Sequence, residues 1–108
     1  MPNKKGNCFE KSAQAILDLN DDKDIHLVHG TAWSKVLKRR IEHAWVEIKD
    51  MIIDPEANAV FHAEKYYALG EIAIAAKYTR TEARAMLLKT ENFGPWESQI
   101  SGGKNAEN

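Results

Sequence analysis

Two short apolar segments, Glu42–Ile48 and Met51–Asp54, stand two residues apart, and this spacing limits the possible folds more than any other feature of the chain. Their aliphatic and aromatic residues predict two strands. Lys49 and Asp50 form the natural turn between them, so we predict an antiparallel hairpin. The turn lacks the Asn-Gly pair of the tightest hairpins, which leaves a longer loop as an alternative. Pro55 ends the second strand because proline cannot donate a hydrogen bond to a ladder.

The predicted turn decides which side chains share a face of the hairpin. With Lys49 and Asp50 as the loop, Ile48 pairs with Met51, and every second residue along each strand projects to the same side. The shared face then holds His43, Trp45, Glu47, Ile52 and Asp54. Asp54 becomes the diagonal neighbour of His43, with their Cβ atoms up to about 7–8 Å apart. A register slip of one residue would turn Asp54 to the opposite face.

The segments before this hairpin predict a helix and a strand. Asn7 is a good N-cap, and Glu10 completes a capping box, so we predict a helix from about Cys8 to Leu19. Apolar side chains alternate in Ile25–Thr31, which indicates a strand. The basic stretch Lys35–Arg40 is either a loop or a helical turn, and we interpret its charges as a solvated face rather than a patch for an acidic partner.

The segments after the hairpin add two helices and a strand. Phe61–Leu69 predicts a short helix that ends at Gly70. Alternation in Glu71–Tyr78 favours a strand, although its alanine content leaves a helix as the alternative. Thr79 and Glu82 form a second capping box, which opens a helix to about residue 89.

Together these elements predict one α+β domain over residues 1–97. Its N-terminal helix packs on a small antiparallel sheet, and the C-terminal helix covers that sheet. The 108-residue length suits a single domain. Residues 98–108 contain almost no apolar side chains, so we expect a disordered C-terminal tail there.

Charge and composition give no reason to expect several kinds of partner. The formal net charge of −1 gives no electrostatic reason to expect binding to nucleic acid or to an anionic membrane. The sequence contains no run of 18 apolar residues that could span a bilayer, and its start lacks the apolar region of a signal peptide. The single cysteine cannot form an internal disulfide, which favours the reducing cytoplasm. The oligomeric state stays open.

The only cysteine combines with the hairpin face into a candidate catalytic triad. Cys8 is expected in the first turn of a helix, where the helix dipole and unpaired N–H groups favour a thiolate. His43 would act as the base and Asp54 would orient its ring. The backbone N–H of Cys8 is the first candidate for stabilising an oxyanion. Two amide side chains, Asn7 and Gln14, are further candidates, and Trp45 can flank the cleft.

The order of these motifs resembles the core of the papain-like and transglutaminase-like superfamily of cysteine hydrolases. The resemblance covers about Asn7 to Asn58 and rests on Cys8 at a helix start, His-Ala-Trp-Val-Glu, and Ile-Asp-Pro. Small uncharacterised bacterial and phage proteins look similar over more of the chain. The resemblance implies a Cys8–His43–Asp54 triad that transfers acyl groups from the amide bonds of a peptide or protein. A peptidase, a glutamine deamidase and a transglutaminase all fit, and none needs a cofactor.

Non-catalytic interpretations exist for each of these residues. Cys8 can be a small buried apolar residue, His43 a hydrogen-bonded strand residue, and Asp54 a turn former before Pro55. No glutamine precedes Cys8, where papain-like proteases carry an oxyanion-hole glutamine. A non-enzymatic protein-binding module on the same fold is therefore the alternative function. A zinc site from Cys8, His29 and His43 lacks supporting ligand spacing, so no metal is expected.

Overall fold

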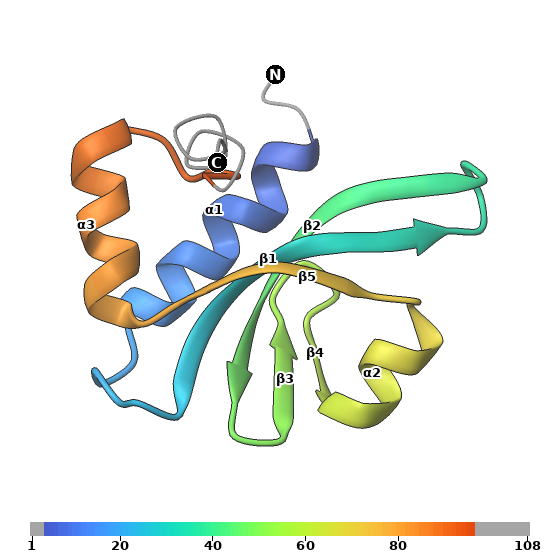
Figure 1. Ribbon diagram of the computed structural model, residues 1–108, viewed down its shortest axis with the longest axis horizontal. Helices are drawn as coiled ribbons and strands as arrows, with labels where there is room; N and C mark the ends of the chain where they lie inside the picture. The colour runs from blue at the N-terminus through green and yellow to red at the C-terminus, as the bar shows by residue number, and fades with distance from the viewer. Residues whose placement is uncertain (1–3, 97–108) are drawn as a thin grey trace, which may run out of the picture.

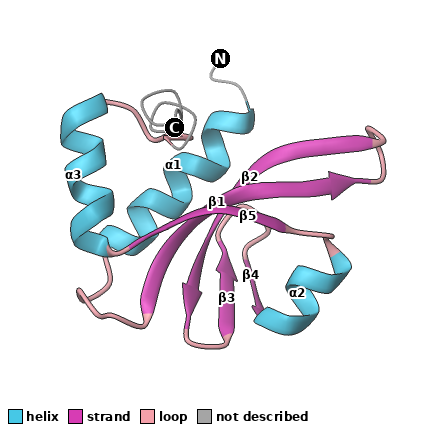
Figure 2. Ribbon diagram, in the orientation of Figure 1, coloured by secondary structure: helices cyan, strands magenta, loops and turns pink. Residues whose placement is uncertain are grey.

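The computed structural model describes residues 4–96 of the 108-residue chain, with side chains from Cys8 on (Figure 1). In chain order the elements are α1 (Lys4–Leu17), β1 (Ile25–Ser34), β2 (Arg39–Ile48), β3 (Met51–Asp54), β4 (Ala59–His62), α2 (Ala63–Leu69), β5 (Ala73–Tyr78) and α3 (Arg80–Thr90). The five strands form one antiparallel sheet in the order β4-β3-β2-β1-β5. Figure 2 shows α1 and α3 close together and α2 apart from them. This layout confirms the predicted α+β class.

The two faces of the central strands β1 and β2 build two separate parts of the core. Leu27 and Val46 are fully buried on the face that packs against α1 and α3. Their neighbours Val28 and Trp45 are fully buried on the opposite face, which packs against α2. Successive residues of a strand point to opposite faces, so an apolar segment of this kind is covered on both sides.

The predicted hairpin forms with the predicted register. Ile48 pairs with Met51 across the turn, and Val46 pairs with Ile53. Lys49 adopts a positive φ of 56°, as the first residue of some tight hairpin turns does. The side chains of His43, Trp45, Glu47, Ile52 and Asp54 therefore share one face, as expected.

The structure contains a second, longer hairpin, formed by β1 and β2, for which the sequence did not distinguish a loop from a helical turn. The basic stretch between residues 35 and 38 is its turn, and β2 begins at Arg39 rather than at Glu42. Ser34 pairs with Arg39, so the ladder between β1 and β2 continues to the turn. In Figure 1 this hairpin projects from the molecule as an arm.

The prediction of the first helix start was wrong. α1 begins at Lys4, so Asn7 is not its N-cap and Cys8 is the fifth residue of the helix, in its second turn. Asparagine inside a helix costs only a few tenths of a kcal/mol relative to average residues, so a local capping signal does not stop a helix from extending. The helix also ends at Leu17 rather than at Leu19.

The segment after Asp54 contains a strand that the sequence prediction missed. β4 pairs with β3, with Ile53 opposite Val60, and α2 starts only after it. The helical prediction from Phe61 was too early because a short apolar run fits both a strand and a helix. Gly70 is the C-cap of α2 as predicted, but in a right-handed conformation with φ −89°.

The C-terminal elements follow the prediction. β5 occupies most of the segment expected as a strand. The Thr79 side chain accepts from the Glu82 N–H at 3.1 Å, and the Glu82 carboxylate accepts from the Thr79 N–H at 2.9 Å, which completes the capping box of α3. Residues 98–108, the expected tail, lie outside the described residues. Between residues 4 and 96, no helix is long and apolar enough to cross a bilayer.

Gly30 lies opposite His43 in the β1–β2 ladder, at a register shift between β1 and β5, and the sheet requires its lack of a side chain. An added Cβ would lie 2.2 Å from the Ala73 carbonyl oxygen and 3.1 Å from the Trp45 ring. We expect Gly30→Ala to lower the free energy of unfolding by about 1–3 kcal/mol or more, because the backbone of β5 must move. Urea denaturation followed by circular dichroism measures this change.

Gly70→Ala is the matched control for that substitution. Its added Cβ would lie 3.1 Å from the flexible Ile72 side chain, which can move away. Equal effects of the two alanine substitutions would contradict the steric argument.

Candidate active site

The structure brings the three residues of the predicted triad together. The Cys8 Sγ lies within 4.8 Å of a ring nitrogen of His43. On the other side of the imidazole, His43 Nε2 lies 3.1 Å from Asp54 Oδ2. The His43 ring therefore stands between a thiol and a carboxylate, with only 14% of its side chain exposed.

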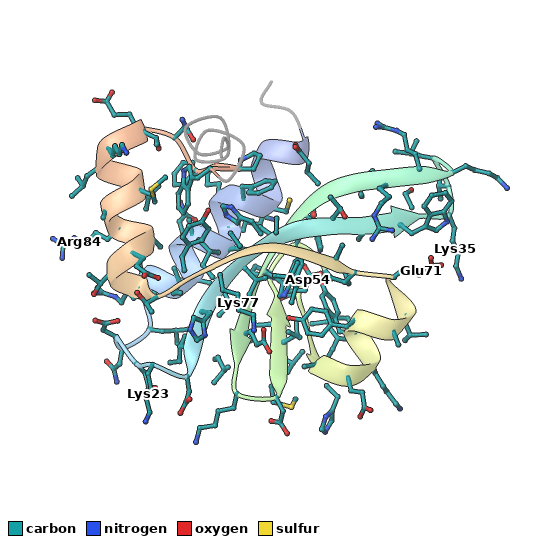
Figure 3. All side chains as sticks on the ribbon, viewed as in Figure 1. Lys23, Lys35, Asp54, Glu71, Lys77 and Arg84 are labelled. Atoms are coloured by element: carbon teal, nitrogen blue, oxygen red, sulfur yellow. The ribbon has the colours of Figure 1, made fainter. Side chains whose placement is uncertain are left out.

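The short length of β3 creates the place where these groups meet. The last pair between β2 and β3 joins Val46 to Ile53, so among the described strands none covers this edge of β2 at His43. Asp54 ends β3 one position beyond that pair. Cys8 packs against Ala44 on the opposite face of β2. The thiol and the imidazole lie on opposite faces of β2 and come close to each other around its uncovered edge. Figure 3 shows Asp54 near the centre of the molecule.

Hydrogen bonds fix the orientation of the imidazole. Tyr66 Oη lies 2.9 Å from His43 Nε2 and donates to Asp54 Oδ2 at 2.8 Å. The backbone N–H of Ala57 donates to Asp54 Oδ1 at 3.0 Å. The carboxylate can only accept, so Nε2 carries a proton and donates it. The opposite nitrogen, Nδ1, faces away from Asp54 and lies 4.0 Å from Glu56 Oε1. Nδ1 is therefore the nitrogen that can exchange a proton near Cys8.

The pKa shifts of His43 and Asp54 favour an ion pair between the two side chains. Burial of the ring lowers the pKa of His43, but hydrogen bonds with Asp54 and Cys8 and the charges of both groups raise it by more, to about 9 from 6.5. Burial by itself would raise the pKa of Asp54, but hydrogen bonds from His43, Ala57 and Tyr66 hold it below its ordinary value of 3.8. The imidazolium and the carboxylate are therefore both charged at neutral pH.

Tyr66 has a fixed role as a donor in this group. Burial, the charge of Asp54 and the hydrogen bond to Asp54 raise the pKa of Tyr66. Its hydroxyl keeps its proton at neutral pH and continues to donate to the carboxylate. Tyr66 and Ala57 together hold Asp54 in the position that orients His43.

Two cavities meet at His43. The larger has a volume of about 560 Å³ and runs along the uncovered edge of β2. Its lining consists of Cys8, Leu37, Arg39, Arg40, Ile41, Glu42, His43 and Glu56. The smaller has a volume of about 290 Å³ and lies toward α2, with a lining of Ala32, His43, Asp54, Phe61, Tyr66, Leu69, Gly70 and Ile72. Cys8 and His43 thus both line a cleft of the size that small ligands and side chains occupy.

Trp45 lies against His43 and is part of the core. Its ring is fully buried, with its centroid 5.5 Å from that of His43. Its indole N–H donates to Tyr67 Oη at 3.3 Å, and Tyr67 donates to Glu47 Oε1 at 2.7 Å. Trp45 therefore flanks the imidazole on the face where the sequence placed it.

The structure does not place the predicted oxyanion donors, the Cys8 N–H and the Gln14 side chain, where they could donate into the cleft beside the thiol. As the fifth residue of α1, Cys8 has its own backbone N–H in the helical hydrogen-bond ladder. Gln14 is exposed and donates to Glu10 at 3.4 Å, and it does not line the cleft. Asn7 lies inside α1, and its side chain is outside the described part of the chain. Among the side chains that line the cleft, N–H donors come from Arg39, Arg40 and His43.

Sequence reasoning missed three groups at the site. The Tyr66 hydroxyl and the Ala57 N–H hold Asp54, and Glu56 lies beside both Cys8 and His43. Glu56 and Ala57 follow Asp54 closely, so an Asx-type turn after the aspartate was the available signal. Tyr66 had no such signal, because its approach depends on how α2 packs on the sheet.

The zinc ligands considered from the sequence are separated by the sheet. His29 is fully buried on the α1 face, with its ring centroid 4.8 Å from that of Phe9 and 4.9 Å from that of Trp96. His43 projects from the other face. The side chain near Cys8 and His43 that could also bind a metal is Glu56, not His29.

Comparison of the chain with protein-family models, with curated proteins and with solved structures found no match in any of the three. The resemblance to papain-like and transglutaminase-like enzymes rests on the motifs themselves and stays a prediction.

Proposed function

We propose that the protein is a cysteine-dependent enzyme that transfers acyl groups from amide bonds. The observation that carries this proposal is the position of His43 between the Cys8 thiol and the Asp54 carboxylate, in a ring orientation fixed by Tyr66. A nucleophile, a base and a group that orients the base are the parts that covalent catalysis by cysteine requires. The order of the three residues along the chain is also that of the papain-like and transglutaminase-like superfamily.

The proposed reaction has two steps. In the first, the Cys8 thiolate attacks the amide carbonyl, a C–S bond forms, the C–N bond breaks, and the imidazolium gives its Nδ1 proton to the leaving amine. In the second, neutral His43 accepts a proton from water or from an amine as that group attacks the thioester. The thiolate leaves and the imidazolium forms again. Asp54 stays ionised and holds the ring throughout.

The identity of the acceptor decides between a hydrolase and a transferase. With water the product is a carboxylic acid, as for a peptidase or a glutamine deamidase, and with an amine it is a new amide. The cleft of about 560 Å³ can admit a side chain or a short extended segment of a peptide or protein. A cytoplasmic location, where thiols stay reduced, belongs to this proposal.

The direct test is acylation of Cys8 by an activated acyl donor. The reduced full-length protein is mixed with p-nitrophenyl acetate, p-nitrophenol release is followed, and the adduct is located by intact and peptide mass spectrometry. We expect an initial burst of p-nitrophenol with the acetyl group on Cys8, followed by slower turnover. Cys8→Ala is expected to lose both the burst and the adduct while keeping its circular dichroism spectrum.

An acetyl group that spreads over lysine side chains at the same rate in wild type and in Cys8→Ala would overturn the proposal. The buried position of Cys8, with only 2% of its surface exposed, would then identify it as a core residue of a binding module.

A further inference from the structure

The residues beside the thiol form a second kind of site that the acyl-transfer proposal does not use. Cys8 Sγ, a ring nitrogen of His43 and a carboxylate oxygen of Glu56 all lie within 4.8 Å of one another. His43 Nδ1 and Glu56 Oε1 are 4.0 Å apart. Thiolate, imidazole and carboxylate are the three ligand types that proteins offer to zinc.

The spacing of these atoms is close to what zinc requires. Zinc bonds of about 2.0–2.3 Å at tetrahedral angles place neighbouring ligand atoms about 3.4–3.6 Å apart. Glu56 is the ligand with the most freedom to move, because its side chain is 39% exposed on the turn after β3. Cys8 and His43 are held by their surroundings. Side-chain movements of about 1 Å would therefore bring the three ligand atoms to the spacing that zinc requires.

The groups behind His43 also suit metal binding. A histidine ligand usually donates its other ring N–H to a carboxylate, which fixes its tautomer and makes it a better ligand. His43 Nε2 lies 3.1 Å from Asp54 Oδ2 and is held there by Tyr66, so Nδ1 is the ring nitrogen left for a metal, which would displace its proton. This observation is independent of the ligand distances and points to the same species.

The cleft provides access, charge balance and a fourth position. The three residues line its wall, so an ion can reach them from solvent. A thiolate and a carboxylate together neutralise a divalent cation, and Nδ1 loses its proton on binding, as metal ligation requires. Three protein ligands leave the fourth tetrahedral position to water or to a substrate atom in the cleft.

We propose that Cys8, His43 and Glu56 bind one Zn²⁺ ion, with Asp54 positioning His43, and that the bound ion blocks the Cys8 thiol. The proposal depends on the positions of the ligand atoms and does not require that Cys8 be a nucleophile in acyl transfer. If both proposals hold, free zinc is a reversible inhibitor of the enzyme.

The test combines zinc titration with protection of the thiol. The reduced full-length protein is titrated with Zn²⁺ by calorimetry, and Co²⁺ serves as an optical probe because a thiolate ligand gives a sulfur-to-cobalt charge-transfer band. We expect one Zn²⁺ ion to bind per chain. Bound zinc should slow the alkylation of Cys8 by iodoacetamide about tenfold or more, and EDTA should reverse this effect. Asp54→Asn should weaken zinc binding about 10–100-fold.

Two ligand variants and one control make the site specific. Cys8→Ser should lose the charge-transfer band. Glu56→Gln should weaken zinc binding about tenfold or more, because the loss of a ligand should weaken binding at least as much as the loss of a residue that positions a ligand. His62→Gln removes an exposed histidine on β4 and should change neither. Circular dichroism confirms that each variant is folded.

Three outcomes would overturn the zinc site. These are no binding of Zn²⁺, binding that Cys8→Ser and Glu56→Gln leave unchanged, and alkylation that zinc does not slow. The acyl-transfer proposal has a separate test. It is overturned if Cys8 is not acylated in metal-free protein in EDTA.

Discussion

Replacing His43 by alanine is expected to lower the rate of Cys8 acylation by p-nitrophenyl acetate about 10²–10⁴-fold at neutral pH. The physical reason is that His43 lies beside Cys8 and is held by the buried carboxylate of Asp54. Because Cys8 lies in the second turn of α1, the helix N-terminus contributes less to forming the thiolate than the sequence suggested. We therefore expect activation of the thiol to depend on the imidazole.

His62→Ala is the matched control for this experiment. His62 is exposed at the end of β4 and lines neither cavity near Cys8. The measurement is the rate of the p-nitrophenol burst in EDTA, at equal amounts of folded protein. A folded His43→Ala protein that is acylated as fast as His62→Ala would show that His43 does not activate the thiol.

The ion pair between His43 and Asp54 predicts that the protein is least stable at alkaline and acid pH. The pKa of His43 is about 9 in the folded protein and 6.5 in an unfolded chain, so its contribution to stability is complete below about pH 6.5 and is lost as pH rises through 9. This contribution is on the order of 3 kcal/mol, from about 1.4 kcal/mol per pKa unit. The pKa of Asp54 is lowered, so its contribution is present above 3.8 and is lost as pH falls below that value.

The measurement is the free energy of unfolding in urea from about pH 6 to pH 9, with metal removed. We expect a fall of about 2–3 kcal/mol over this range in the wild type. Asp54→Asn should lose most of this fall, because an amide cannot hold the imidazolium by charge. Identical pH profiles for wild type and Asp54→Asn would contradict the ion pair.

The sequence predicted the hairpin register because every feature that determines the register lies within a short stretch of the chain. Ile52 and Asp54 had to share a face with His43 once Lys49 and Asp50 formed the turn, and alternation along a strand has no other solution. The diagonal contact between His43 and Asp54 therefore followed from spacing alone. The approach of Cys8 was suggested by motif order, and the structure supplies the reason, which is the uncovered edge of β2.

The parts that the sequence could not predict depend on packing between distant elements. Asn7 looked like a helix cap, yet α1 begins at Lys4, because intrinsic preferences at helix ends differ by little more than thermal energy. Tyr66 reaches Asp54 only because β4 turns the chain before α2 begins, and that strand was itself missed. Glu56 becomes a neighbour of Cys8 only when the turn after β3 and the N-terminal helix meet at the same edge.

The pH dependence of Cys8 alkylation measures most directly whether His43 activates the Cys8 thiol. The rate of reaction with iodoacetamide is followed by mass spectrometry in EDTA, for wild type and for His43→Ala. Because an imidazolium beside a thiol favours reaction as the thiolate, we predict that the wild type reacts faster than His43→Ala at neutral pH, and that His43→Ala shifts the profile toward alkaline pH. Rates that rise through the ordinary thiol midpoint of about 8.5 in both proteins would contradict the account.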